Sequence, residues 1–247
     1  MKVTFVGCGD AFGSGGRGNT CIRLDTQGRT IVVDFGATAL LSWHRLGFST
    51  DDIDAIVVSH LHGDHFGGLP FLLLEAQFVA ERRKPLTIVG PPGTRNRIEM
   101  ACEVFFPGMT ANRWNYTWNV EELPPGSNFE LEGVDVHTME MRHPSGAPAT
   151  GLQLGDGRKT FAYTGDTGWN DNIIPLAGRS DLFVTECYSG ERSIPNHVDW
   201  HTLRRNLPDI GAKKIAVTHL GRSALACTRE MEAEGLIVAE DGKVIDL

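Results

Sequence analysis

The chain has 247 residues, of which 41% are hydrophobic and 22% are charged, and its formal net charge is −8. These values are ordinary for a globular protein, so the composition predicts a packed chain and excludes an intrinsically disordered one. The negative net charge argues against broad, sequence-independent binding to nucleic acid, because such binding needs clustered lysine and arginine side chains.

Five cysteines stand at positions 8, 21, 102, 187 and 227, and none of them forms a C-x-x-C pair. An odd number of scattered cysteines does not predict a disulfide framework, so we interpret them as reduced thiols of a cytoplasmic protein. The apolar run that precedes the first glycines is too short for the core of a signal peptide. No stretch approaches the roughly 20 apolar residues that a membrane span requires.

In chain order, the first half alternates β-branched runs with glycine-rich turns and then with helical patterns. The expected elements are strands at 3–7, 19–26 and 30–36, a helix at 39–47, a strand at 53–60, a helix at 69–84, a strand at 85–93 and a helix at 94–106. The run 53–60 is continuously apolar, which is typical of a strand that is buried on both faces.

The second half repeats this pattern, and no linker or low-complexity segment divides the chain. The expected elements are strands at 119–124, 134–143, 149–155, 159–166, 181–188 and 213–220, a helix at 199–211 and a small strand unit at the C-terminus. We therefore expect one domain over residues 1–247. Two facing sheets with helices outside, an αββα sandwich, would bury these apolar strands, although periodicity alone does not exclude other α/β arrangements.

The strongest chemical signal is the sequence HLHGDH, which directly follows the predicted buried strand. It places His60, His62, Asp64 and His65 within six residues. Imidazole nitrogens and carboxylate oxygens are the ligands that Zn²⁺ and related divalent ions accept. In an extended loop, residues 60 and 62 project to the same side, and a turn at Gly63 would direct Asp64 and His65 to a neighbouring position. The segment therefore predicts a metal site.

This segment resembles the H-x-H-x-D-H signature of the metallo-β-lactamase superfamily. The resemblance implies the four-layer αββα fold and a site for two divalent ions, Zn²⁺ or alternatively Mn²⁺. It also implies three later ligands, and His143, Asp166 and His219 follow strand-like runs in the required order. By this resemblance, the first metal is bound by His60, His62 and His143, the second metal is bound by Asp64, His65 and His219, and Asp166 bridges both.

Such a site predicts a hydrolase, because two ions can share a hydroxide and neutralise the charge that grows on a phosphodiester. Asp64, His197 and Glu186 are the expected catalytic residues. His197 resembles the non-ligand histidine of phosphodiesterase-type members, which assists the leaving group, and Glu186 resembles its acidic partner. His201 is a rival for this role whose spacing fits less well. Asp34 resembles the strand-end aspartate that holds a ligand histidine, and it could equally be a turn residue.

Within the superfamily, the sequence resembles ribonuclease Z and the cyclic phosphodiesterase of phosphonate breakdown. His143 and Asp166 are only 23 positions apart, so the tRNA-clamping arm of ribonuclease Z is absent. We therefore expect a small or cyclic phosphodiester as the substrate, with no membrane partner and no extended nucleic-acid binding. The phosphodiesterase branch includes a member with an additional cysteine-based metal site near the N-terminus. This sequence has only Cys8 and Cys21 there, so that site is not carried over, and whether either cysteine has a metal role stays open.

Other functions stay open at this point. A lactonase or thioesterase would use the same ions on a carboxyl ester, and a ribonuclease Z-like nuclease without the arm would cut RNA. A non-catalytic or di-iron redox role is a further alternative, although the intact histidines at 60, 62 and 65 favour hydrolysis. A symmetric homodimer is the default expectation for an enzyme of this kind.

Overall fold

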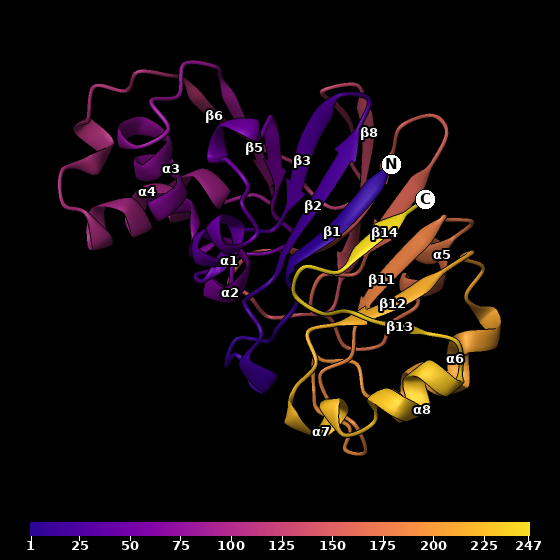
Figure 1. Cartoon of the computed structure of the whole chain (residues 1–247). Helices are drawn as coiled ribbons and strands as arrows, with labels where there is room; N and C mark the ends of the chain where they lie inside the picture. The colour runs from indigo at the N-terminus through magenta and orange to yellow at the C-terminus, as the bar shows by residue number, and fades with distance from the viewer.

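The computed structural model describes all residues 1–247 as two facing β-sheets with helices on their outer sides (Figure 1). In spatial order, the first sheet contains β14 (Val244–Asp246), β1 (Lys2–Gly7), β2 (Cys21–Thr26), β3 (Arg29–Val33), β4 (Ala55–Val57), β5 (Leu86–Gly90) and β6 (Trp118–Glu122). Strands β3 to β6 are parallel, and the other neighbours in this sheet are antiparallel.

The second sheet has the same size and is also mixed. Its spatial order is β13 (Ile237–Val238), β12 (Ile215–Thr218), β11 (Leu182–Glu186), β10 (Thr160–Tyr163), β9 (Ala149–Gly155), β8 (Val134–Met141) and β7 (Asn128–Leu131). Strands β10 to β13 are parallel, whereas β7 to β10 are joined by antiparallel pairing.

Eight α-helices and four short 3₁₀ helices complete the fold. The α-helices are α1 (Ala39–Arg45), α2 (Gly63–Phe66), α3 (Leu69–Phe78), α4 (Thr94–Phe105), α5 (Ile173–Ala177), α6 (Trp200–Asn206), α7 (Arg222–Leu225) and α8 (Thr228–Ala233). The 3₁₀ helices are η1 (Ser14–Gly16), η2 (Thr50–Asp52), η3 (Met109–Ala111) and η4 (Leu207–Asp209).

Three apolar layers hold these elements together. One lies between the two sheets, one lies between the first sheet and helices α1 to α4, and one lies between the second sheet and helices α5 to α8. The segment around β4 is continuously apolar because its side chains alternate between two of these layers. Ala55 and Val57 belong to the layer between the sheets, whereas Ile56 and Val58 belong to the layer under the helices. The four-layer αββα sandwich is therefore confirmed.

Two details of the sequence prediction are wrong. The helix expected over 69–84 ends at Phe78, because the chain turns so that Arg82 becomes buried. The Arg82 guanidinium donates to the carbonyls of Ile53 at 2.8 Å and Pro85 at 2.6 Å, contacts that a continuing helix would not allow. The C-terminal strands do not form one unit, since β13 pairs with β12 and β14 pairs with β1. The C-terminus therefore ties the two sheets together.

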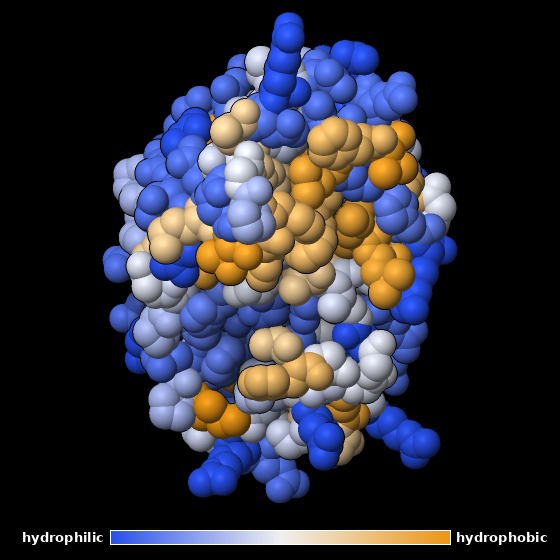
Figure 2. Space-filling model, turned by 90° about the vertical axis from the view of Figure 1, so that its left-hand side faces the viewer, coloured by the Kyte–Doolittle hydropathy of each residue, from blue (hydrophilic) through white to orange (hydrophobic).

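The outer face of α3 and α4 exposes several large apolar side chains. Figure 2 shows apolar atoms gathered over the upper part of the face of the molecule on which these helices lie, with a polar hollow below them. The exposed side chains are Phe71, Phe78, Val79, Met100, Val104 and Phe105. A large contiguous apolar patch is uncommon on a monomeric protein. The expected homodimer stays a prediction, and this face is the surface on which it can be tested. None of the helices has the length and hydropathy of a membrane-crossing segment.

Candidate metal centre

The seven predicted ligands come from four strands, and each one follows the carboxyl end of its strand. His60 follows β4, and the chain then enters the one-turn helix α2, which carries Asp64 and His65. His143 follows β8, Asp166 follows β10 and His219 follows β12. Side chains beyond the carboxyl ends of strands meet in a shared crevice in open α/β sheets. At Gly63, where the sequence predicts a turn, the structure has the first residue of helix α2.

The structure brings the seven side chains into two adjoining clusters. The first contains His60, His62, His143 and Asp166, and the second contains Asp64, His65, Asp166 and His219. Within each cluster, the potential ligand atoms all lie within 4.8 Å of one another. Asp166 is the one residue common to both clusters, which is the position expected of a carboxylate between two ions.

Contacts within the clusters link residues that are far apart in the sequence. His219 Nε2 lies 3.2 Å from Asp64 Oδ2 and 3.3 Å from Asp166 Oδ2. His65 Nε2 lies 3.3 Å from Asp166 Oδ1. His60 Nε2 and His143 Nε2 lie 3.8 and 3.9 Å from Asp166 Oδ2. The carboxylate of Asp166 is therefore surrounded by four imidazole rings.

Unpartnered polar atoms show that this donor set fits metal ions. The buried atoms His60 Nε2, His65 Nε2 and Asp166 Oδ1 all lack a hydrogen-bond partner although they point into the clusters. Buried polar groups are normally paired, and an orphaned group calls for an explanation such as an ion. Three imidazoles with carboxylates suit Zn²⁺ and similar divalent ions. The residues present thus fit the metal pair that the sequence predicts.

The electrostatics of the clusters agree with this fit. Burial lowers the pKa of the His60 and His143 imidazoles, so both rings are neutral and can offer a nitrogen lone pair. Burial would raise the pKa of Asp166, but the charges of His219 and His65 outweigh it and hold that pKa well below its usual value. Around His65, burial is outweighed by Asp166 and Asp34, which raise its pKa. The same negative potential favours a divalent cation.

Asp34 supports two of the ligand histidines from behind. Its Oδ2 atom lies 2.7 Å from His65 Nδ1, and its carboxylate also accepts from the Ser59 backbone N–H and hydroxyl at 2.7 and 2.8 Å. The Ser59 hydroxyl in turn lies 3.1 Å from His60 Nδ1. Such contacts fix the ring orientation and leave the Nε2 atoms free for metals. Of the two interpretations of Asp34, the structure supports the histidine-holding one.

A glycine allows the metal-binding loop to approach this support. Gly36 lies so close to α2 that a Cβ atom on it would stand 2.1 Å from the backbone oxygen of Asp64. Any side chain at position 36 would therefore push the helix away, and Asp64 and His65 would move with it.

His197 lies beside the clusters with Glu186 behind it. The His197 Nδ1 atom is 2.9 Å from Glu186 Oε1, and Glu186 is fully buried, whereas the His197 side chain is 20% exposed. The ring centroid of His197 lies 4.9 Å from that of His143 and 5.9 Å from that of His219. Burial lowers the pKa of His197, but the hydrogen bond and charge of Glu186 outweigh it and raise that pKa above its ordinary value. This arrangement can hold a proton next to the metal centre.

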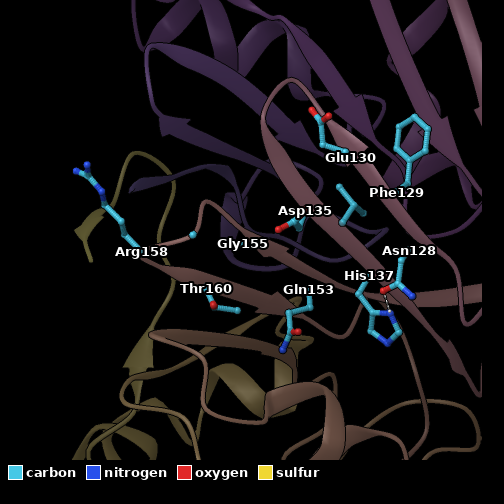
Figure 3. Close-up of a pocket in the computed structure, with 11 residues that line it drawn as sticks. Asn128, Phe129, Glu130, Asp135, His137, Gln153, Gly155, Arg158 and Thr160 are labelled. Atoms are coloured by element: carbon cyan, nitrogen blue, oxygen red, sulfur yellow. Dashed lines mark hydrogen bonds between the residues drawn. The ribbon is translucent and has the colours of Figure 1, made fainter.

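The other residues considered from the sequence lie apart from the clusters. His201 is exposed on α6, and none of the five cysteines belongs to either group of potential ligands, since all five are free and buried. A depression of about 830 Å³ occupies the outer face of the second sheet (Figure 3), where the His137 ring bonds Asn128 at 2.9 Å. No potential metal ligand of the two clusters lines this depression. It is a polar, solvated sheet face rather than the chemical site.

Sequence reasoning missed Ser59 and Tyr188. Ser59 stands directly before His60, and its hydrogen bonds to Asp34 could have been suspected only from that adjacency. Tyr188 lies two residues after Glu186, and its ring centroid is 4.8 Å from that of His197. A polar aromatic residue just beyond a predicted strand-end acid is the signal that could have found it.

The fold and the clustered ligands define a metallo-β-lactamase fold protein. The human tRNase Z, short form, superposes with a TM-score of 0.79 at 24% identity over 100% of this chain and 99% of that chain. A diphosphatase from the PhnP family gives a TM-score of 0.78 at 17% identity over 100% of this chain and 97% of that one. These structural likenesses establish the fold.

Sequence comparison identifies the family. A family model described as "Anti-Pycsar protein Apyc1" matches residues 1–242, so the chain belongs to this family. It is also related to ribonuclease Z of Clostridium beijerinckii, with 31% identity over 90% of this chain and 88% of that protein. Ribonuclease Z of Methanosarcina acetivorans is 30% identical over 62% of this chain and 48% of that protein. The chain thus spans about half the length of the latter relative.

Proposed function

We propose that the protein is a hydrolase that uses two divalent ions to cleave a small or cyclic phosphodiester. The observation that carries the proposal is the carboxylate of Asp166 shared by two ligand clusters, with the His197–Glu186 pair beside them. A site of this kind can bind the anionic oxygens of a phosphodiester and supply a proton to the departing oxygen.

In this proposal, His60, His62 and His143 hold the first ion, and Asp64, His65 and His219 hold the second, with Asp166 between them. The ions would be Zn²⁺ or Mn²⁺, since imidazole and carboxylate ligands accept both. When bound, they lower the pKa of a water molecule and neutralise the charge on the phosphate. The ligand residues contribute by fixing the ion positions, and Asp64 additionally borders the reacting centre.

His197 is assigned the proton transfer. Glu186 holds Nδ1, which leaves Nε2 to face the crevice beside His143 and His219. From there, Nε2 would donate its proton to the departing alkoxide, and the buried Glu186 carboxylate would stabilise the protonated ring until then. Glu186 is itself fixed, since its Oε1 atom accepts from the Thr167 backbone N–H at 2.6 Å.

Two features support a small substrate over tRNA. Between His143 and Asp166 the structure has only a short loop, the β9–β10 hairpin and a short turn, so there is no long arm to clamp an RNA. The net charge of −8 also disfavours a long polyanion, whose binding is driven by the release of counterions. A PhnP-family diphosphatase, whose name denotes a reaction at phosphorus, shares the fold over nearly the full length of both chains.

The alternative reactions differ in their need for His197. Hydrolysis of a lactone or thioester releases an alcohol or a thiol. The same ions can assist the departure of this leaving group, so His197 would be dispensable. An RNA endonuclease would require His197 and would also need a surface for RNA beyond the metal centre. The substrate preference and the His197 dependence together separate these reactions.

The test is a substrate panel with protein reconstituted separately with Zn²⁺ and Mn²⁺. We expect hydrolysis of bis(p-nitrophenyl) phosphate and of cyclic nucleoside monophosphates, with little activity on lactones, thioesters or precursor tRNA. Chelation should abolish the activity, and stoichiometric metal should restore it. Preferential cleavage of lactones or thioesters would overturn the proposal, and oxygen-dependent activity of a di-iron form would overturn hydrolysis altogether.

A further inference from the structure

His219 is held differently from the other ligand histidines. The rings of His60, His65 and His143 each have a hydrogen-bond partner at Nδ1, and such a partner fixes the orientation of a ligand ring. The buried Nδ1 atom of His219 has no partner. The orientation of this ligand, which belongs to the second cluster, therefore depends on how its backbone is held.

The backbone of His219 is fixed by the N-terminal part of the chain. The residue has a φ of +56°, in the left-handed region that residues other than glycine rarely adopt. Its N–H donates to the Cys8 carbonyl at 3.0 Å, and the Thr218 hydroxyl donates to the same oxygen at 3.2 Å. Cys8 is fully buried. The position of His219 thus follows the position of the Cys8 carbonyl.

Cys8 begins a glycine-rich segment, residues 8–18, whose two ends pack against each other. The Gly9 N–H donates to the Gly18 carbonyl at 2.6 Å. A Cβ atom on Gly9 would stand 2.7 Å from the Arg17 carbonyl oxygen and 2.9 Å from the Arg17 Cβ atom. Only a residue without a side chain allows this close approach, which brings the N–H groups of Cys8 and Gly18 near each other.

The carboxylate of Asp241 holds these two N–H groups. Its Oδ1 atom accepts from the Cys8 N–H at 3.0 Å and from the Cys8 thiol at 3.2 Å, and its Oδ2 atom accepts from the Gly18 N–H at 2.7 Å. Asp241 stands in the link between β13 and β14, which lies beside β1 (Figure 1). The Gly242 N–H fastens this link to β1 by donating to the Phe5 carbonyl at 2.7 Å.

We propose that Asp241 is a positioning residue for the second metal ion, and that it acts through the Cys8 backbone on His219. The inference rests on the proposed function, because it requires that two ions bind the clusters. Asp241 is exposed and belongs to neither cluster. The first ion should not depend on it, since the ligands His60 and His143 have their own partners.

The test measures the affinities of the two Zn²⁺ ions by competition with chelators of graded strength. His143→Ala and His219→Ala each remove a ligand of one cluster only, so they assign the two affinities to the clusters. Asp241→Ala removes the contacts with both N–H groups. It should weaken the second ion about 10-fold, the lower end for residues that support a metal ligand, and the first ion by less than about 2-fold.

Asp241→Asn is the conservative variant. Its amide oxygen can still accept from one of the two N–H groups, whereas its amide nitrogen cannot accept from the other. The variant should therefore recover part of the lost affinity, with the second ion about 3-fold weaker than in the wild type. The affinity of the first ion should equal the wild-type value.

Asp156→Ala is the matched control. The Asp156 Oδ1 atom also accepts from two backbone N–H groups, those of Arg158 and Lys159 at 2.9 and 2.7 Å, and its Oδ2 atom accepts from the Thr26 hydroxyl. Asp156 belongs to neither cluster, so both Zn²⁺ affinities should stay at the wild-type values. Thermal unfolding of the metal-free proteins measures how far each variant destabilises the fold.

Three outcomes would overturn the inference. Equal weakening of both ions by Asp241→Ala would mean that Asp241 only stabilises the fold. An unchanged affinity of the second ion in both Asp241 variants would mean that His219 needs no support from Cys8. An equal loss of the second ion in Asp156→Ala would point to general destabilisation. Failure of the proposed function is separate, because it would appear as absent phosphodiester hydrolysis by the wild-type protein, whereas these affinities need no turnover.

Discussion

The molecule contains two histidine–carboxylate pairs that look alike but occupy different surroundings. In the Asp34–His65 pair, both side chains are fully buried, and the ring nitrogen opposite the aspartate faces Asp64 and Asp166 at 3.4 and 3.3 Å. In the Glu186–His197 pair, the acid is buried, but the histidine is 20% exposed and packs against other rings. In both pairs the carboxylate holds Nδ1 and leaves Nε2 free.

The difference shows that the role of a paired histidine depends on what its second nitrogen faces. A ring nitrogen that faces carboxylates in a buried cluster is placed to bind a cation. A ring nitrogen that faces an open crevice can instead exchange a proton with a ligand. Removal of either pair should therefore give a distinct result. The first pair should control metal content, and the second should control turnover at constant metal content.

The largest effect is expected for Asp166→Asn, which changes the residue common to both clusters. A neutral amide cannot balance the charge of two divalent ions. Loss of a residue that only supports a metal ligand typically lowers metal affinity up to about 100-fold, so the fall in Asp166→Asn should be larger, and activity should drop to background. Metal analysis after dialysis and the phosphodiester assay measure both quantities. Asp181→Asn, at a carboxylate that binds Lys159 and Lys213, is the control. Full metal content in Asp166→Asn would contradict the assignment.

His197→Ala should lower kcat about 10²- to 10⁴-fold on a phosphodiester with a poor leaving group, because it removes the proton donor. The loss should be much smaller with p-nitrophenolate as the leaving group, since that anion departs without a proton. Metal content should remain that of the wild type. The matched control is His201→Ala, which removes an exposed histidine from the nearby helix α6. Loss of metal from His197→Ala would reassign this residue as a ligand.

Asp34→Asn should weaken metal binding about 10- to 100-fold through the orientation of His65. Position 34 has a φ of +57°, a conformation that asparagine tolerates, so the backbone should be preserved. A chelator competition measures the affinity, and Asp25→Asn, at a surface carboxylate that pairs with Arg23, is the control. An unchanged affinity would mean that Asp34 contributes only to packing.

Glu186→Gln should give the smallest effect, seen in the pH profile. The proton that His197 donates is present below its pKa and is lost as the pH rises through that pKa. Because Glu186 raises the pKa of His197, the alkaline limb of kcat should move to lower pH in the variant. A profile of kcat against pH measures the shift, with equal metal content as the control. An alkaline limb that stays at the wild-type pH would contradict a role of Glu186 in the proton transfer.

The sequence by itself determined the chemistry of the ligands and most of the elements. His60, His62, Asp64 and His65 lie within six residues, so their arrangement depends mainly on local geometry. The apolar runs around β4, β5, β10 and β12 were predicted because burial on both faces leaves a continuous signal. The order of His143, Asp166 and His219 after strand-like runs could also be read, but only through the family pattern.

The tertiary structure decided every contact between distant segments. The 3.2 Å approach of His219 to Asp64 spans 155 positions, and the pairing of β14 with β1 joins the two ends of the chain. Neither leaves a local pattern, because strand pairing and side-chain convergence depend on which surfaces the whole fold buries together. The same holds for the packing of the Tyr188 ring beside His197, which is possible because Gly221, on a different segment, leaves room for the ring.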